Sequence, residues 1–368
     1  MHLKYIMLLA TLTLSSCAFQ NQKLNQVDQW LQERHISNHF HGSVTIGVKQ
    51  GIVYSKSFGI ADRNWSIPNS ESTRFDIGSI NKSFIAYMIM QMVEAGKLAL
   101  EDKLSKHLNY VGPHKEQITL HQLLTHTSGI PDYDQMPDSL KVNQFEAGKR
   151  LHFDTDGYIK FISSLGSVGK PGAQFYYSNF AYHLLALLIE EKTQKHFSEA
   201  LDSMICKPLG LKQTYAPLDN YQVYTNVATP YQYKEEEFFE SPFIDYSLGR
   251  RIFSTTSDLY WWGREMQDPT LISPASQQLM LTNHLPEINS EVSYGYGWVV
   301  FDGLGTYRMG KMDVTGNYII HGGATDGYRA LLVVYEEGEW IVSILGNTGR
   351  MVDELRTGEQ ILKILTEK

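Results

Sequence analysis

The sequence has few cysteines and fewer positive than negative charges. Only Cys17 and Cys206 occur in 368 residues, so a framework of several disulfides is excluded. The formal net charge is −8 and there is no basic stripe, which argues against nucleic acid as a partner. No repeat period or low-complexity block occurs either, which disfavours a repeat architecture.

What remains is typical of a folded protein with a large core. Hydrophobic residues make up 42% of the chain and charged residues 20%, ordinary values for a globular protein. A chain of this length can bury its core as one large domain or as two.

The N-terminus contains a short apolar run, from Tyr5 to Leu14. It is too short for a permanent membrane span but suits the core of a signal peptide. It ends in Leu14-Ser15-Ser16-Cys17, which resembles the lipobox of bacterial lipoproteins. The resemblance implies removal of residues 1–16, a lipid on Cys17 and a tether at 17–23.

Export and a lipid anchor on a bacterial membrane are therefore expected, facing the periplasm or at the cell surface. Ala18 after the cysteine favours the outer membrane over the inner one. The alternative is an ordinary secretory signal cut nearby, with Cys17 as a free thiol. With Cys17 lipidated, Cys206 has no partner for a disulfide and is expected to pack as an apolar residue.

Strand patterns occupy both ends of the chain and helical patterns its middle. Alternation around a turn at Lys49-Gln50-Gly51 predicts a hairpin over residues 42–59, and further strands are expected after residue 294. The sequence therefore predicts an α+β fold with one antiparallel sheet, built from residues 24–85 and 240–368 and flanked by terminal helices. Residues 86–239 are expected to form an inserted, mostly helical domain, with ligands bound at the boundary.

A possible nucleophile lies at the start of a helix that is apolar on nearly every face. Ser79 and Lys82 are three residues apart, which places hydroxyl and amine on one helix face. A serine nucleophile with a lysine base needs that arrangement. The motif is short, however, and a chance occurrence remains the alternative. A second copy, Ser167 with Lys170, is followed by Pro171 and is not expected to be helical.

Two later motifs complete a pattern: Tyr177-Ser178-Asn179 and His321-Gly322-Gly323. With Ser79 and Lys82, they resemble the serine β-lactamase and penicillin-binding-protein superfamily. The branch holds class C β-lactamases, D-alanyl-D-alanine carboxypeptidases, D-aminopeptidases and related esterases. The likeness runs from about residue 42 to 346 and implies the β-lactamase/transpeptidase-like fold, without a metal or other cofactor.

The resemblance also implies roles for the first two motifs. Ser79 would attack a carbonyl, with neutral Lys82 as its base. Tyr177 would pass the proton to the leaving group, or would itself be the main base. Asn179 would hydrogen-bond both Lys82 and the substrate's amide.

The third motif is expected to complete an oxyanion hole. By family position its two donors are the backbone amides of Ser79 and Ala324. Gly322 and Gly323 would lie against the substrate, and His321 would donate toward Tyr177 or the substrate.

The substrate is less constrained. His321 in place of lysine resembles the peptidases and esterases, so small D-amino-acid peptides and esters are expected substrates. A class C-like β-lactamase, and a weakly catalytic protein that binds penicillin or cell-wall peptide, remain as alternatives. Arg250 and Arg251 depart from the family's small residues and are hypothesised to bind a substrate carboxylate, the alternative being surface arginines. His126 is interpreted as structural, and no oligomeric state is predicted.

Overall fold

The computed structural model describes residues 20–136, 154–218, 223–241, 250–285, 287–302, 309–325, 327–336, 339–349 and 352–367. The expected signal peptide and Cys17 lie outside these residues. In the described part, no helix is both long and apolar enough to span a membrane.

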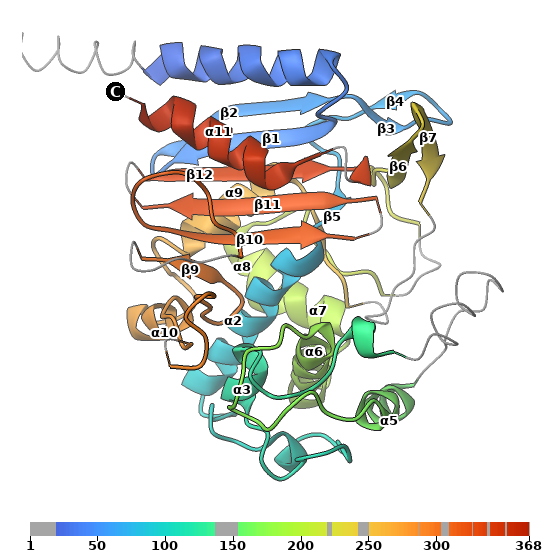
Figure 1. Cartoon of the computed structure of the whole chain (residues 1–368), viewed down its shortest axis with the longest axis vertical. Helices are drawn as coiled ribbons and strands as arrows, with labels where there is room; N and C mark the ends of the chain where they lie inside the picture. The colour runs from blue at the N-terminus through green and yellow to red at the C-terminus, as the bar shows by residue number, and fades with distance from the viewer. Residues whose placement is uncertain are drawn as a thin grey trace, which may run out of the picture.

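A six-stranded antiparallel sheet forms the body of the molecule (Figure 1). Its order is β2-β1-β12-β11-β10-β9, so the N-terminal hairpin is joined to the C-terminal strands by the pairing of β1 with β12. The expected sheet with strands from both chain ends is confirmed. The strands are β1 (Gly42–Val48), β2 (Gly51–Phe58), β9 (Val299–Phe301), β10 (Tyr318–Ala324), β11 (Arg329–Tyr335) and β12 (Trp340–Gly346).

Each face of the sheet packs against its own set of helices. Because side chains alternate along a strand, Leu331 and Val333 of β11 face one core while Leu332 and Val334 face the other. The first core is covered by the N-terminal helix (residues 20–36) and α11 (Glu354–Thr366) (Figure 1). The second contains α2 (Asn81–Glu94), α6 (Asn179–Thr193) and α9 (Thr256–Glu265).

Shorter elements fill the rest of the chain. The remaining α-helices are α3 (Leu120–Leu124), α5 (Thr155–Ser164), α7 (Phe197–Leu201), α8 (Lys207–Leu209) and α10 (Pro274–Met280). The 3-10 segments are η1 (Gly78–Ile80), η2 (Leu104–Lys106) and η3 (Tyr133–Gln135), and η4 (Asp202–Cys206) is a π-helical turn. Two-stranded pairs join β3 (Ile60–Asp62) to β4 (Ile67–Pro68), β5 (Phe75–Asp76) to β8 (Phe253–Ser254), and β6 (Tyr231–Lys234) to β7 (Glu237–Glu240).

The α2 helix is buried on nearly every side, as its composition predicts. Phe84 stacks on Trp262 of α9 with ring centroids 4.0 Å apart, and Ser83 Oγ accepts a hydrogen bond of 2.9 Å from the indole nitrogen. The helix thus connects the sheet layer to the helical part. The helix is apolar on nearly every face because nearly every face packs against other parts of the protein.

Two boundaries differ from the sequence interpretation. Residues 20–23, assigned to a tether, belong to the N-terminal helix, and the buried Lys23 donates a 2.9 Å hydrogen bond to the Ile364 carbonyl. The boundary placed between residues 85 and 86 falls inside the continuous helix α2. The division into two domains stays a prediction.

Candidate active site

Ser79 lies in a tight turn between β5 and α2. Gly78 has a φ of +52°, a conformation that glycine adopts readily, and its N–H donates to Asp76 Oδ1 at 2.8 Å. A Cβ on Gly78 would lie only 2.8 Å from the backbone nitrogen of Ala324. The turn therefore holds Ser79 at a helix start with β10 directly beside it.

The Lys82 amine points back to this serine. Its Nζ lies 3.1 Å from Ser79 Oγ and 2.7 Å from Asn179 Oδ1, and the side chain is buried. Burial disfavours the ammonium form and lowers the pKa of Lys82 to about 7, although the nearby Asp132 opposes this change. A substantial fraction of this amine is therefore neutral near neutral pH and can accept a proton.

Tyr177 stands on the other side of the same amine. The Lys82 Nζ is 4.9 Å from the centroid of its ring, and its hydroxyl interacts with Ser79. Burial raises the pKa of Tyr177 well above its ordinary value, a change that the Ser79 contact partly offsets. The Tyr177 hydroxyl therefore keeps its proton near neutral pH.

His126 positions the tyrosine segment. Its ring lies 4.2 Å from that of Tyr177, its Nδ1 accepts a 3.1 Å hydrogen bond from Ser178 N–H, and its carbonyl accepts one from Tyr176 N–H. Ser178 in turn caps α6 through Ala181 N–H. The structural interpretation of His126 is confirmed.

Asn179 is held by a carboxylate that the sequence interpretation did not assign. Its backbone N–H donates to Asp132 Oδ1 at 3.0 Å, and its side-chain Nδ2 donates to Oδ2 at 2.9 Å. The carboxyl follows the Gly129-Ile130-Pro131 turn in the sequence. The sequence carries no signal for this contact, because Asp132 and Asn179 are 47 residues apart.

The β10 edge closes the site beside Ser79. The β9 strand pairs with residues 318–320, so within the described residues no strand pairs with β10 on that side from His321 onward. Thr325 N–H bonds toward β11, which turns the preceding Ala324 N–H toward the serine turn, since successive amides alternate along a strand. A Cβ on Gly323 would lie 2.0 Å from the Ile77 carbonyl oxygen, so only glycine allows this approach. The arrangement places the Ala324 amide beside the turn that carries Ser79, and an oxyanion hole formed by the Ser79 and Ala324 amides stays a prediction.

His321 has partners other than those expected. Its Nδ1 lies 2.7 Å from the Gly322 carbonyl oxygen, to which it must donate, and its Nε2 then accepts from the Tyr294 hydroxyl at 3.1 Å. Burial lowers the pKa of His321 to about 3, so the ring is neutral. Donation to Tyr177 is not the arrangement seen, whereas donation toward a substrate stays a prediction. Tyr294 was not assigned a role from the sequence.

Both candidate carboxylate-binding arginines face carboxylates of the protein itself. The buried Arg250 has its Nη2 2.6 Å from Oε2 of the partly exposed Glu190, and Arg251 Nη1 lies 3.7 Å from Asp76 Oδ2. Arg250 is thus not on the surface. Binding of a substrate carboxylate by either arginine stays a prediction.

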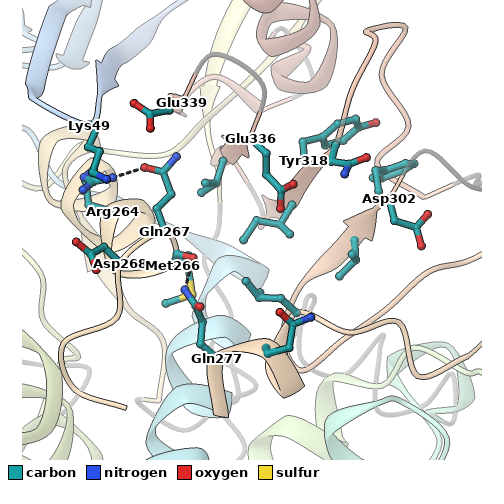
Figure 2. A pocket seen from close by; sticks show the side chains of 17 residues that line it. Lys49, Arg264, Met266, Gln267, Asp268, Gln277, Asp302, Tyr318, Glu336 and Glu339 are labelled. Carbon is teal, nitrogen blue, oxygen red and sulfur yellow. Dashed lines mark hydrogen bonds between the residues drawn. The ribbon is translucent and has the colours of Figure 1, made fainter. Parts of the chain in front are cut away.

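A separate hollow of about 520 Å3 lies where the ends of α9 and α10 meet β9 and β10 (Figure 2). Lys49 and Arg264 face it together with Asp268, Glu336 and Glu339, so its charges are mixed. It contains none of the motif residues described above. In the described ranges, no group of three or more acidic, histidine or cysteine side chains could hold a metal ion.

The family model for Beta-lactamase matches residues 27–366, and the chain therefore belongs to that family. A penicillin-binding protein of Bacillus subtilis is 26% identical over 351 residues, which cover 89% of this chain and 72% of the relative. The chain spans 66–72% of the length of this relative and of a Staphylococcus aureus protein named flp.

Solved structures support the same fold. The octameric penicillin-binding protein homologue from Pyrococcus abyssi has a TM-score of 0.78 at 26% identity, covering 94% of this chain and 78% of its own. A D-amino acid amidase from Ochrobactrum anthropi has a TM-score of 0.74 at 20% identity, covering 93% and 98%. The expected β-lactamase/transpeptidase-like fold is confirmed, within a family of serine hydrolases.

Proposed function

We propose that the protein is a serine hydrolase that forms an acyl-enzyme on Ser79, and that it cleaves small D-amino-acid peptides or small esters. The observation that carries this proposal is the buried Lys82 amine, 3.1 Å from Ser79 Oγ and 2.7 Å from Asn179 Oδ1. A lysine in such a position activates a serine hydroxyl without any metal.

The reaction proceeds in two acyl transfers. Ser79 Oγ bonds to the substrate carbonyl carbon while its proton passes to Lys82, and the Ser79 and Ala324 amides bind the resulting oxyanion. The oxyanion intermediate then collapses, and the bond between the carbonyl carbon and the amine or alcohol breaks. The amine or alcohol leaves with the proton that Ser79 gave up. Water then attacks the ester on Ser79 and releases the acid. Each oxyanion donor contributes about 10²–10³ in rate.

The charge states favour Lys82 over Tyr177 as the principal base. The lysine has a pKa of about 7, whereas burial keeps the tyrosine protonated at that pH. A protonated Tyr177 hydroxyl next to Ser79 is placed to relay the proton to the leaving group. This division of roles follows the rule that a base works best when its pKa is close to the working pH.

A substrate panel with a Ser79→Ala control tests the proposal. The panel holds a D-alanyl-D-alanine peptide, a D-amino acid amide, a small p-nitrophenyl ester and a cephalosporin. Turnover of a peptide, amide or ester, absent in the control, is the expected result. No turnover of any of the four would contradict the proposed reaction.

The principal alternative is a class C-like β-lactamase, which is consistent with the family match. Intact mass after penicillin treatment separates the possibilities. Rapid loss of the drug without a lasting adduct indicates a β-lactamase. A stable adduct, with no turnover of the other substrates, indicates a penicillin-binding protein that is catalytically weak.

Export and anchoring are proposed from the sequence alone. The Leu14-Ser15-Ser16-Cys17 stretch supports lipid attachment at Cys17, which would hold the enzyme at a bacterial membrane, the outer one by preference. We expect the protein to incorporate palmitate. Globomycin should alter this labelling, and Cys17→Ser should abolish it. Equal labelling of the Cys17→Ser variant would contradict the anchor.

A further inference from the structure

Asp132 makes two hydrogen bonds to one residue of the site. Its Oδ1 accepts from the backbone N–H of Asn179 at 3.0 Å, and its Oδ2 accepts from the side-chain Nδ2 at 2.9 Å. Asn179 Oδ1 then faces Lys82 Nζ at 2.7 Å. A chain of polar contacts thus runs from Asp132 through Asn179 to Lys82 and on to Ser79.

The contact with Oδ2 determines which end of the Asn179 amide meets the lysine. A side-chain amide has one acceptor end and one donor end, and turning it exchanges them. Because a carboxylate only accepts, it binds the donor end and leaves the acceptor end for Lys82. In the reverse orientation Nδ2 would face the amine, and two donors would oppose each other.

We propose that Asp132 is a positioning residue of the acyl-transfer site, which fixes the Asn179 amide and, through it, the place and charge of the Lys82 amine. This inference rests on the proposed function of Ser79 for its catalytic consequence. Its effect on Lys82 can be measured without any substrate.

The segment that carries Asp132 is itself tied to the start of α6. The Pro131 carbonyl accepts a 2.8 Å hydrogen bond from Ser178 Oγ, and the Tyr133 ring packs edge-on against Phe180 at 4.9 Å. Asp132 therefore lies between two fixed neighbours. A carboxyl placed so firmly can hold Asn179 without an entropic loss at each turnover.

Lys82 is surrounded by groups that are neutral apart from Asp132. Among the described residues, the titratable groups that interact with it include Asp132, Tyr177, Tyr182, His126, His183 and His321. Burial lowers the pKa of each of the three histidines and raises that of both tyrosines, which keeps all five uncharged near neutral pH. Ionised Asp132 is thus the member of this set that favours the ammonium form of Lys82.

Asp132→Asn removes the charge and one acceptor at nearly constant shape. The matched control is Asp134→Asn, because Asp134 is an exposed carboxylate two residues away that binds Tyr176 rather than Asn179. Asp132→Glu, which keeps the charge, is a second variant in case the first does not fold.

The test is a pH titration of lysine side chains labelled with 13C at Cε, followed by NMR, with Lys82 assigned by its loss in Lys82→Arg. In Asp132→Asn we expect the Lys82 midpoint to fall by more than about 0.5 in pH. Asp134→Asn should leave the midpoint unchanged, and Asp132→Glu should keep it near that of the unmodified protein. Equal midpoints in Asp132→Asn and the unmodified protein, or equal shifts in the two Asn variants, would overturn the inference.

Kinetics give the second readout. Asp132→Asn should lower kcat/KM about 10- to 100-fold, mostly through kcat, and move its acid limb to lower pH. Asp134→Asn should do neither. If the unmodified protein turns over no substrate while the Lys82 midpoint still responds to Asp132→Asn, the proposed reaction fails and the positioning of Lys82 by Asp132 stands.

Discussion

Replacing Lys82 with methionine should stabilise the protein while abolishing its activity. The amine is buried beside neutral rings, and this environment lowers its pKa from 10.5 to about 7. Methionine has a similar length and helix propensity and carries no charge to desolvate. Lys82→Met therefore removes the free-energy cost of burying the amine, with little change in the shape of the side chain.

The magnitude follows from the pKa change. At 1.36 kcal/mol for each tenfold change in proton affinity, lowering the pKa from 10.5 to about 7 corresponds to at most about 5 kcal/mol. Methionine also loses the hydrogen bonds to Ser79 and Asn179, which together oppose the gain by about 2–3 kcal/mol. The expected net increase in the free energy of unfolding at pH 7 is about 2 kcal/mol.

This gain should depend on pH in a defined direction. Between pH about 7 and 10.5 the unfolded chain holds a proton on Lys82 that the native chain has lost, so the stability of the unmodified protein rises with pH. The advantage of Lys82→Met should therefore shrink over this window, reach zero near about pH 9 and become a small disadvantage by about pH 10, where only the loss of the hydrogen bonds remains.

Guanidinium denaturation followed by tryptophan fluorescence at pH 7 and 10 measures both effects. Lys170→Met is the matched control, since Lys170 is the exposed lysine of the second Ser-x-x-Lys copy, and it should change stability by less than about 0.5 kcal/mol. A Lys82→Met variant that is less stable than the unmodified protein at pH 7, or an advantage that does not change with pH, would refute the reasoning.

Three further predictions follow from the same contacts. Gly323→Ala should abolish activity and lower the melting temperature, because its Cβ would lie 2.0 Å from the Ile77 carbonyl oxygen. Gly322→Ala should keep a near-normal melting temperature, because the nearest neighbour of its Cβ is 3.8 Å away. Similar changes in melting temperature for the two variants would contradict this. Arg250→Ala should destabilise the protein by about 2 kcal/mol in a denaturant titration, because it removes the ionic partner of the partly exposed Glu190 carboxylate, to which Phe197 N–H still donates. A loss below about 0.5 kcal/mol would count against a stabilising pair. The acid limb of the kcat/KM profile should rise through pH about 7 as Lys82 loses its proton, and a limb near 10 would contradict the lowered pKa of this lysine.

The sheet and the positions of the candidate-site motifs could be predicted from the sequence because both follow local patterns. Alternation around a turn predicts the hairpin of β1 and β2, and an apolar stretch after Gly78 predicts the buried α2. The three short motifs then fall on the turn before α2, the start of α6 and β10. The spacing of three residues also predicted the pairing of Ser79, in η1, with Lys82 in the first turn of α2.

Contacts between distant segments could not be predicted in the same way. Asp132 meets Asn179 across 47 positions, and Arg250 meets Glu190 across 60. His321 pairs with Tyr294 rather than with Tyr177, because its ring donates to the adjacent carbonyl and presents only an acceptor. Such pairings depend on how elements pack in three dimensions, which neither periodicity nor motif spacing reports.

The most direct test of the account is the site of covalent labelling by a fluorophosphonate. After brief exposure near pH 8, intact mass should show a single adduct, and peptide mapping should place it on Ser79. Ser79→Ala should remain unlabelled, and Lys82→Met should label far more slowly although it is folded. An adduct on any other residue, or a Lys82→Met variant that labels at the normal rate, would contradict the claim that Lys82 activates Ser79.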